Sequence, residues 1–280
     1  MKTENQKHIE TYQNLIKLSC SGRTIDRYTS IVSKYLTTVG DPKAATYAET
    51  LKFIHTFKSQ SSKKQAQGAL MHFYKGVVHR PDLIPRLPKI KQAQKLPEIL
   101  SQTEITTLLS SVKNLKHKTI ITLLYHCGLR INELLNIQIK DINGTNRTLH
   151  VKYSKGAKHR MVPFSLDVLL LLRKYFKQYQ PKNYLFNGQN TLKYTASSVR
   201  KFLHKEVSKL HIIKNITPHC LRHSRATHLL NNGVDIKMVK DFLGHFKIET
   251  TERYLHLTVQ DLQNQIDQAD TKIFTLQIAS

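Results

Sequence analysis

The first part of the chain carries apolar residues at helical spacing. Between Gly22 and Gly40 the apolar positions recur every three to four residues, and Gly40 follows as a stop signal. Similar patterns cover residues 4–19, 46–59 and 61–79. They predict four short amphipathic helices in a compact bundle, with Lys and Arg on the faces turned away from its core.

Residues 80–100 interrupt this periodicity. The segment contains four prolines and several lysines, which break helices and favour solvent. We interpret it as a linker between a helical domain at 1–90 and a second domain at 97–280. The sequence SQTE at 101–104 has the spacing of a capping box and predicts the start of the next helix.

The second domain combines helices with a short stretch of alternating apolar and polar residues. This alternation covers residues 137–164 and includes Asn143-Gly144, a common turn dipeptide. It predicts two or three short antiparallel strands, so the fold class is mainly α with a small antiparallel β-sheet. Helical patterns resume near 166–178, 194–209, 217–231 and 234–242.

The charge of the chain changes the picture of its partner. The 280 residues include 44 Lys and Arg against 19 Asp and Glu, a net charge of +25. Residues 1–96 alone hold 17 basic and 6 acidic residues, so the excess is not confined to a tail. Such a charge predicts a polyanionic partner. Nucleic acid fits better than an anionic membrane surface, because no basic amphipathic helix stands out.

Three cysteines, Cys20, Cys127 and Cys220, lie far apart and form no CxxC pair. This spacing favours neither a disulfide framework nor a zinc site and fits a reducing, cytoplasmic compartment. The N-terminus lacks the apolar core of a signal peptide, and the longest apolar runs are too short to span a bilayer. We therefore expect no membrane association.

Two polar residues stand in unusual contexts in the middle of the chain. Arg130 lies among apolar residues in YHCGLRINELL, so we expect it to be buried and to need an anionic partner. Taken alone, Arg130 fits a structural ion pair with Glu133 as well as it fits a functional site for an anion. Lys155 precedes Gly156 at an expected hairpin tip, where it can reach a phosphate, although an isolated turn lysine is usually only solvated.

The segment TPHCLRHSRATHLL begins with a strong helix start, Thr217 followed by Pro218. His219 and Arg222 are three residues apart and so share one helix face. They lie close to the helix N-terminus, where backbone N–H groups favour anions. A capped helix with a structural histidine is the alternative, but two cation-capable side chains on this face favour an anion site.

The segment LGHFKIETTERYLHL supplies the last candidates. Gly244 is expected to end a helix, His245 follows it, and Tyr254 lies nine residues further on, within an expected short helix. A lone tyrosine is usually a core residue, so Tyr254 has no functional meaning by itself.

Taken together, the four segments resemble the tyrosine recombinase (phage integrase) family, and specifically its Xer-like branch. CGLRINELL, SKGAKHRMVP, HCLRHSRATHLL and LGHFKIETTERYLHL are similar to the family's motifs in wording, order and spacing across about residues 97–260. The first 90 residues match only the general character of the family's helical, SAM-like core-DNA-binding domain. The resemblance implies a two-domain, C-shaped clamp around DNA.

The resemblance also implies roles for six residues. Tyr254 would attack a DNA phosphodiester and form a 3′-phosphotyrosyl link, and Lys155 would protonate the leaving 5′-oxygen. His219 would exchange a proton with the tyrosine, and His245 would donate a hydrogen bond to the phosphate. The phosphate oxygens would be bound by two guanidinium groups, and these positions match Arg130 and Arg222.

The implied partners are a specific double-stranded DNA site and further recombinase subunits, as a homo-tetramer on DNA or a hetero-tetramer with a related recombinase. The implied location is cytoplasmic, nucleoid-associated and bacterial in type. No metal or cofactor is implied, and the sequence contains no convincing Asp/Glu cluster for magnesium.

Two features depart from the pattern or extend it. Arg225 stands where the family often has an apolar residue, and from there it could reach DNA, a partner subunit or an acidic neighbour. The final 15 residues, IDQADTKIFTLQIAS, carry several apolar side chains. They are either a frayed end or, as the resemblance implies, a tail that docks on a neighbouring subunit.

Two other functions compete with site-specific recombination through a Holliday junction. A catalytically silent, architectural DNA-binding protein would fit if Tyr254 or an arginine were missing, and none is. Strand relaxation like that of a type IB topoisomerase uses similar chemistry, but the Xer-like motifs and the separate helical domain argue against it.

Overall fold

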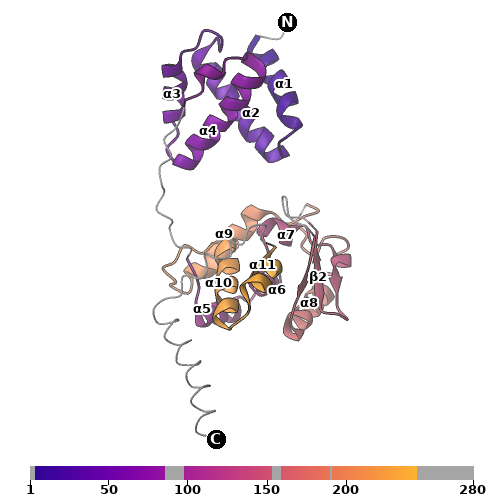
Figure 1. The fold of residues 1–280 in the computed structure, drawn as a ribbon. Helices are drawn as coiled ribbons and strands as arrows, with labels where there is room; N and C mark the ends of the chain where they lie inside the picture. Colours follow the sequence, from indigo (N-terminus) through magenta and orange to yellow (C-terminus); the bar gives the residue numbers. More distant parts are fainter. Residues whose placement is uncertain (1–3, 86–97, 153–158, 190, 245–280) are drawn as a thin grey trace, which may run out of the picture. The chain divides into compact units, whose positions relative to one another are not determined.

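The chain divides into two compact units, Met1–Gln94 and Lys95–Ser280, which are described separately (Figure 1). The computed structural model describes residues 4–85, 98–152, 159–189 and 191–244. Within these ranges no helix is both long and apolar enough to cross a lipid bilayer.

The first unit is helical, and its four main helices lie close to the predicted ranges. Thr46 and Glu49 form a capping box in which each side chain binds the other residue's backbone N–H, which fixes where one of these helices begins. The elements are α1 (Glu4–Lys17), α2 (Gly22–Val39), α3 (Tyr47–His55), α4 (Gln60–Phe73), the π-turn η1 (Tyr74–Val78) and the 3₁₀ turn η2 (Pro81–Leu83).

Aromatic side chains fill the core of this unit, and their hydroxyl groups are paired inside it. The Tyr35 hydroxyl lies 2.8 Å from Thr50 Oγ1 and 2.5 Å from the Tyr74 hydroxyl. Tyr12 donates to the Ala69 carbonyl at 3.0 Å. Burying a hydroxyl costs free energy unless it is hydrogen-bonded. These bonds therefore allow large rings to be buried without orphaned polar groups.

The second unit is built around α6, whose buried residues point in every direction rather than along one stripe. Helices α5, α8, α9 and α10 all pack against it. The helices are α5 (Gln102–Ser111), α6 (Leu115–His126), α7 (Ile131–Leu135), the 3₁₀ turn η3 (Ile139–Asp141), α8 (Leu166–Tyr179), α9 (Ala196–Ser208), α10 (Pro218–Asn231) and α11 (Ile236–Leu243).

A three-stranded antiparallel sheet of order β1-β2-β3 lies beside α8 (Figure 1). Its register pairs Leu149 with Val162 and Val151 with Arg160. Leu149, Val151 and Val162 all face the core, so Arg160 stands on the same inward face. The strands are β1 (Ile142–Asn143), β2 (Thr148–Val151) and β3 (Arg160–Pro163), in agreement with the predicted sheet.

A small separate apolar cluster fixes α11 on α10. Ala226 and Leu230 of α10 pack against Val239 and Leu243 of α11. Gly244 ends α11 with a φ of 67°, as the sequence predicted, because a left-handed residue there costs glycine little. The C-terminal end of α11 is thereby brought to the region where α7 begins.

Candidate active site

Arg222 is held in the second turn of α10. The helix starts at Thr217, whose side chain accepts from the Cys220 N–H, and Pro218 occupies the first turn, as predicted. The Arg222 side chain is only 3% exposed. Its Nη1 donates to the Gly128 carbonyl at 2.5 Å and its Nη2 to the Leu243 carbonyl at 2.7 Å. Two carbonyls from distant segments therefore orient the guanidinium.

Arg130 is the N-cap residue of α7, and it is less buried than the sequence analysis expected. Its side chain is 31% exposed, because the apolar residues around it in sequence turn to the core while its guanidinium reaches the surface. Nη1 donates to Glu133 Oε1 at 2.8 Å, so the ion pair considered as an alternative is present. Nη2 donates to the Gly244 carbonyl at 3.2 Å.

Gly128 makes this approach of segments possible. Its φ is +57°, a conformation that L side chains rarely adopt. A Cβ at this position would lie 2.7 Å from Leu243 Cδ2 and 3.1 Å from Phe242 Cε1. Both the backbone conformation and the close contact with the end of α11 therefore require glycine here.

Glu133 is the anion at the centre of the cluster, and its side chain is 1% exposed. Arg160 binds it with both guanidinium nitrogens, Nη1 to Oε1 at 3.1 Å and Nη2 to Oε2 at 2.9 Å. Arg222 Nη1 lies 3.7 Å from Oε2. Burial alone would raise the pKa of Glu133, but the hydrogen bonds and charge of Arg160, the Arg130 N–H and the charge of Arg222 hold that pKa below its ordinary value. The carboxylate is therefore ionised.

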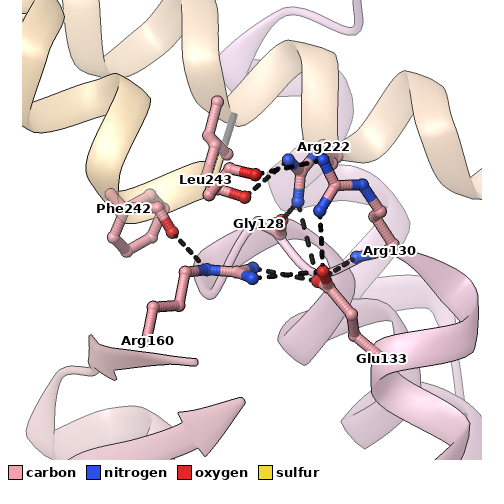
Figure 2. A network of polar contacts seen from close by, with 8 residues as sticks. Gly128, Arg130, Glu133, Arg160, Arg222, Phe242 and Leu243 are labelled. Carbon is pink, nitrogen blue, oxygen red and sulfur yellow. Dashed lines mark hydrogen bonds and ion pairs between the residues drawn. The ribbon is translucent and has the colours of Figure 1, made fainter. Parts of the chain in front are cut away.

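The end of α11 contributes three consecutive carbonyls to the same cluster (Figure 2). Phe242 O accepts from Arg160 Nε at 2.9 Å, and the two following carbonyls accept from Arg222 and Arg130. The last carbonyls of a helix have no partner within the helix and carry partial negative charge. Each of the three arginines thus satisfies one of these carbonyls. We call Arg130, Glu133, Arg160 and Arg222 the arginine hub.

The arginine hub carries more positive than negative charge. Three guanidinium groups surround one carboxylate, and partial charges from the helix end balance only part of the remainder. All three guanidiniums come from the four sequence segments quoted above, although only Arg130 and Arg222 were predicted as site residues. The arrangement can bind an anion with planar, forked donors, for which a phosphate diester is well suited.

Comparison with known proteins agrees with this geometry. Residues 98–261 match the model of the phage integrase family. Tyrosine recombinase XerA of Pyrococcus horikoshii is 30% identical over 273 residues, which cover 95% of this chain and 94% of that protein. The chain belongs to the phage integrase family. It is a tyrosine recombinase, as the four sequence motifs predicted.

Two further likenesses place this recombinase among its relatives. A tyrosine recombinase of Thermosipho africanus is 39% identical over 178 residues, and this match spans 62% of each protein. A solved structure, the XerH site-specific recombinase bound to difH substrate, has a TM-score of 0.69 at 22% identity and covers 95% of this chain and 85% of that one. At that identity the structural likeness establishes the fold, mainly α with a small antiparallel sheet.

His219 lies in the first turn of α10 of the recombinase, three residues before Arg222. Its side chain is open to solvent, and its ring centre lies 6.3 Å from that of His223. Partial desolvation lowers the pKa of His219, and the charges of Arg222, Arg130 and Arg200 lower it further. The imidazole is therefore neutral at neutral pH and able to accept a proton.

Three of the six predicted site residues, Lys155, His245 and Tyr254, lie outside the described residues. So does the C-terminal tail. The structure therefore brings together Arg130 and Arg222 in the arginine hub and places His219 on the same helix as Arg222. Sequence reasoning missed Arg160. The sequence did carry a usable signal. Arg160 and the apolar Val162 are two residues apart on β3, so the charged side chain lies on the core-facing side of the strand.

Arg225 has a more local environment than the three options raised from the sequence. Its guanidinium carbon lies 5.6 Å from the centre of the Tyr125 ring, a cation–π contact. The Tyr125 hydroxyl in turn lies 2.8 Å from His228 Nδ1. Arg225 therefore packs against α6.

Neither a metal cluster nor a disulfide bond appears in the described part of the chain. It contains no group of three His, Cys, Asp or Glu residues able to hold a metal ion. Cys20, Cys127 and Cys220 are all free thiols, and burial raises the pKa of Cys127 to about 12.

Proposed function

We propose that this chain is a site-specific DNA recombinase that cuts and rejoins strands through a 3′-phosphotyrosyl intermediate. The observation that carries the proposal is the arginine hub. It fixes two guanidiniums, Arg130 and Arg222, beside the end of the helix that leads in sequence to His245 and Tyr254. A tyrosine nucleophile needs such a cationic environment, because a free phenol with a pKa of about 10 is a poor nucleophile at neutral pH.

In the proposed reaction the two arginines bind the non-bridging oxygens of the scissile phosphate. Arg130 is partly exposed, and its two described side-chain hydrogen bonds use two of the five N–H donors of a guanidinium. Charge that builds on the phosphate in the transition state meets donors that are already oriented. Such preorganised donors stabilise the transition state more than the ground state.

The proton and bond changes balance without a cofactor. The bond from Tyr254 Oη to phosphorus forms while the bond from phosphorus to the 5′-oxygen breaks. His219, whose pKa is lowered, takes up the tyrosine proton, and Lys155 gives a proton to the 5′-oxygen. His245 donates to the phosphate. Because one phosphate ester replaces another, the reverse reaction rejoins the strand without ATP, and exchange between two duplexes proceeds through a Holliday junction.

The proposed partners are duplex DNA with a specific recombination site and further subunits of the same or a related recombinase, assembled as a tetramer. The net charge of +25 and the named relatives support DNA as the partner. Residues 1–90 would form the core-DNA-binding domain, residues 80–100 the linker and residues 97–280 the catalytic domain. Phosphate contacts would dominate affinity and make it strongly salt-dependent. The site of action would be the bacterial nucleoid in the cytoplasm.

The test is a search for a covalent protein–DNA adduct. The full chain is incubated with end-labelled genomic fragments, and nicked duplexes made from bound fragments trap the cleaved state. We expect an adduct that resists denaturant and disappears in Tyr254→Phe. Specific, salt-sensitive binding without any adduct would overturn the catalytic proposal in favour of an architectural DNA-binding protein.

A second assay separates recombination from strand relaxation. Two plasmids that carry the identified site are incubated with the chain, and the products are resolved by size and by superhelical density. Recombinant molecules are expected. Relaxed plasmid without recombinants would instead indicate an activity like that of a type IB topoisomerase.

A further inference from the structure

We propose that Arg160, outside the six proposed catalytic positions, is a positioning residue for strand cleavage. It would hold Glu133 and the end of α11 so that Arg130 and Arg222 keep their orientation toward the phosphate. The inference rests on the proposed function for its effect on cleavage, while its structural part can be tested without DNA.

Arg160 differs from the other two arginines because its guanidinium donates to both oxygens of Glu133. Its side chain is 9% exposed, so it is more buried than Arg130 at 31% and slightly less buried than Arg222 at 3%. All three guanidinium nitrogens donate hydrogen bonds: Nε to the Phe242 carbonyl, and Nη1 and Nη2 to the two oxygens of Glu133. A buried guanidinium whose three nitrogens all donate to protein groups orients those groups rather than a ligand.

The position of Arg160 links three separate pieces of the unit. The residue begins β3, Glu133 belongs to α7, and Phe242 belongs to α11 (Figure 2). Arg160 also lies close to Gly244, the residue that follows α11, because a Cβ at Gly244 would lie 2.9 Å from Arg160 Nη1. One side chain therefore fixes the strand, the helix that Arg130 caps, and the backbone just before His245.

The effect on the other arginines follows from the shared carboxylate. Glu133 accepts from Arg130 at 2.8 Å, while Arg222 Nη1 stands 3.7 Å from it. Without the two-pronged contact of Arg160, the buried carboxylate would be drawn toward Arg222, its remaining buried cation. Both guanidiniums would then turn away from the geometry set by the three carbonyls of α11.

A lysine cannot replace this contact. It keeps the positive charge, but its single ammonium lacks the planar fork that spans both oxygens of a carboxylate. Arg160→Lys therefore separates charge from positioning. Arg173→Lys is the matched control, because Arg173 is an exposed arginine on α8 and outside the arginine hub.

The cleavage experiment uses the full chain and the nicked duplex identified by the adduct assay, at saturating protein in single turnover. We expect Arg160→Lys to lower the cleavage rate constant by at least about 10-fold, since misplacing a catalytic group by ~1 Å can cost 100-fold. The dissociation constant for DNA should change less than about 3-fold, because Arg160 makes no proposed phosphate contact. Equal cleavage by wild type and Arg160→Lys would overturn the inference.

A modified substrate separates positioning from a general structural role. A methylphosphonate at the scissile position removes one of the charged oxygens that the arginines neutralise. The ratio of the cleavage rate constants of wild type and Arg160→Lys should be smaller on this substrate, because the orientation of Arg130 and Arg222 then matters less. An unchanged ratio of rate constants would show that Arg160 only supports the fold.

Two measurements keep the inference testable if the single variant unfolds or the wild type does not cleave. Glu133→Gln/Arg160→Gln removes one negative and one positive charge together, so the arginine hub keeps its net charge, and the variant should still cleave slowly. Cleavage at the wild-type rate would contradict the proposal.

Without DNA, hydrogen exchange of the amides at the end of α11 should be faster in Arg160→Lys. Absence of an adduct with wild type would refute the proposed function, whereas unchanged exchange would refute the positioning role.

Discussion

The two units stabilise their buried polar groups in opposite ways. In the first unit, Tyr35, Tyr74 and Thr50 form a neutral network of hydroxyl groups inside an aromatic core. In the second, Glu133 and the arginines around it form a charged network. Neutral hydrogen bonds lose little on burial, whereas buried ion pairs pay a large desolvation cost that their attraction only partly offsets. The first network contributes to stability, and the second fixes the orientation of the arginines that the proposed function assigns to the phosphate.

Glu133→Gln is expected to have the largest effect, because it disrupts the charged network of the second unit. It leaves the arginines of the hub around an uncharged amide, and breaking a buried charge network in this way costs about 3–5 kcal/mol of unfolding free energy. Urea unfolding of the full chain measures the loss. Glu98→Gln is the control, because Glu98 is exposed in the same unit and should change stability little. Equal stability of the two variants would contradict the role assigned to the carboxylate.

Arg222→Lys should reduce activity rather than DNA affinity. The lysine keeps a charge but cannot bind Gly128, Leu243 and a phosphate with one planar fork. We expect the cleavage rate constant to fall about 100- to 1,000-fold, the range for loss of one transition-state donor. The rate is measured in single turnover on nicked DNA, with Arg173→Lys as control. A variant that cleaves as fast as wild type would remove Arg222 from the proposed mechanism.

Tyr35→Phe tests the neutral network of the first unit. It removes one hydroxyl and leaves Thr50 and Tyr74 without that partner, at a cost of about 1–2 kcal/mol. Thermal or urea unfolding measures the loss, and Tyr47→Phe, at an exposed position, should show none. The cleavage rate constant at saturating DNA should not change. A large drop in that rate would mean that the two networks are not separate in function.

The smallest expected effect is a dependence of stability on pH. Burial lowers the pKa of His117, His126 and His228 in the second unit, and it is the main cause of the lowered pKa of His219. The unfolded chain then binds more protons than the folded one, so this stability is complete above the unfolded pKa of about 6.5 and is lost as the pH falls through the folded values. Unfolding free energies at pH 7.5 and 5.5 measure the loss. His126→Gln should flatten the slope, and an unchanged slope would exclude His126 as a contributor.

Features set by neighbours in sequence could be predicted without a structure. The capping box at Ser101 and Glu104, the start of α10 at Thr217 and the end of α11 at Gly244 all appear where the residues indicated. Each depends on hydrogen bonds or backbone angles within a few residues. Local chemistry is therefore enough to locate them.

Features set by tertiary contacts could not be predicted in this way. No boundary was drawn for α6, because a helix buried on all sides has no polar stripe to mark its period. The exposure of Arg130 was misjudged, since apolar sequence neighbours do not show which way one side chain turns. The contact between Arg160 and Glu133 crosses 27 residues and joins β3 to α7, so no local pattern indicates it.

The sequence separations inside the arginine hub bear on the order in which the second unit folds. The contacts of Phe242, Leu243 and Gly244 with Arg160, Arg222 and Arg130 span 82, 21 and 114 residues. Closing the two longer loops costs chain entropy before any bond is gained, so we expect those two contacts to form late. During synthesis, a chain that has not yet reached Phe242 lacks all three acceptors. The arginines can therefore take up their final orientation only after α11 has been made and has docked on α10.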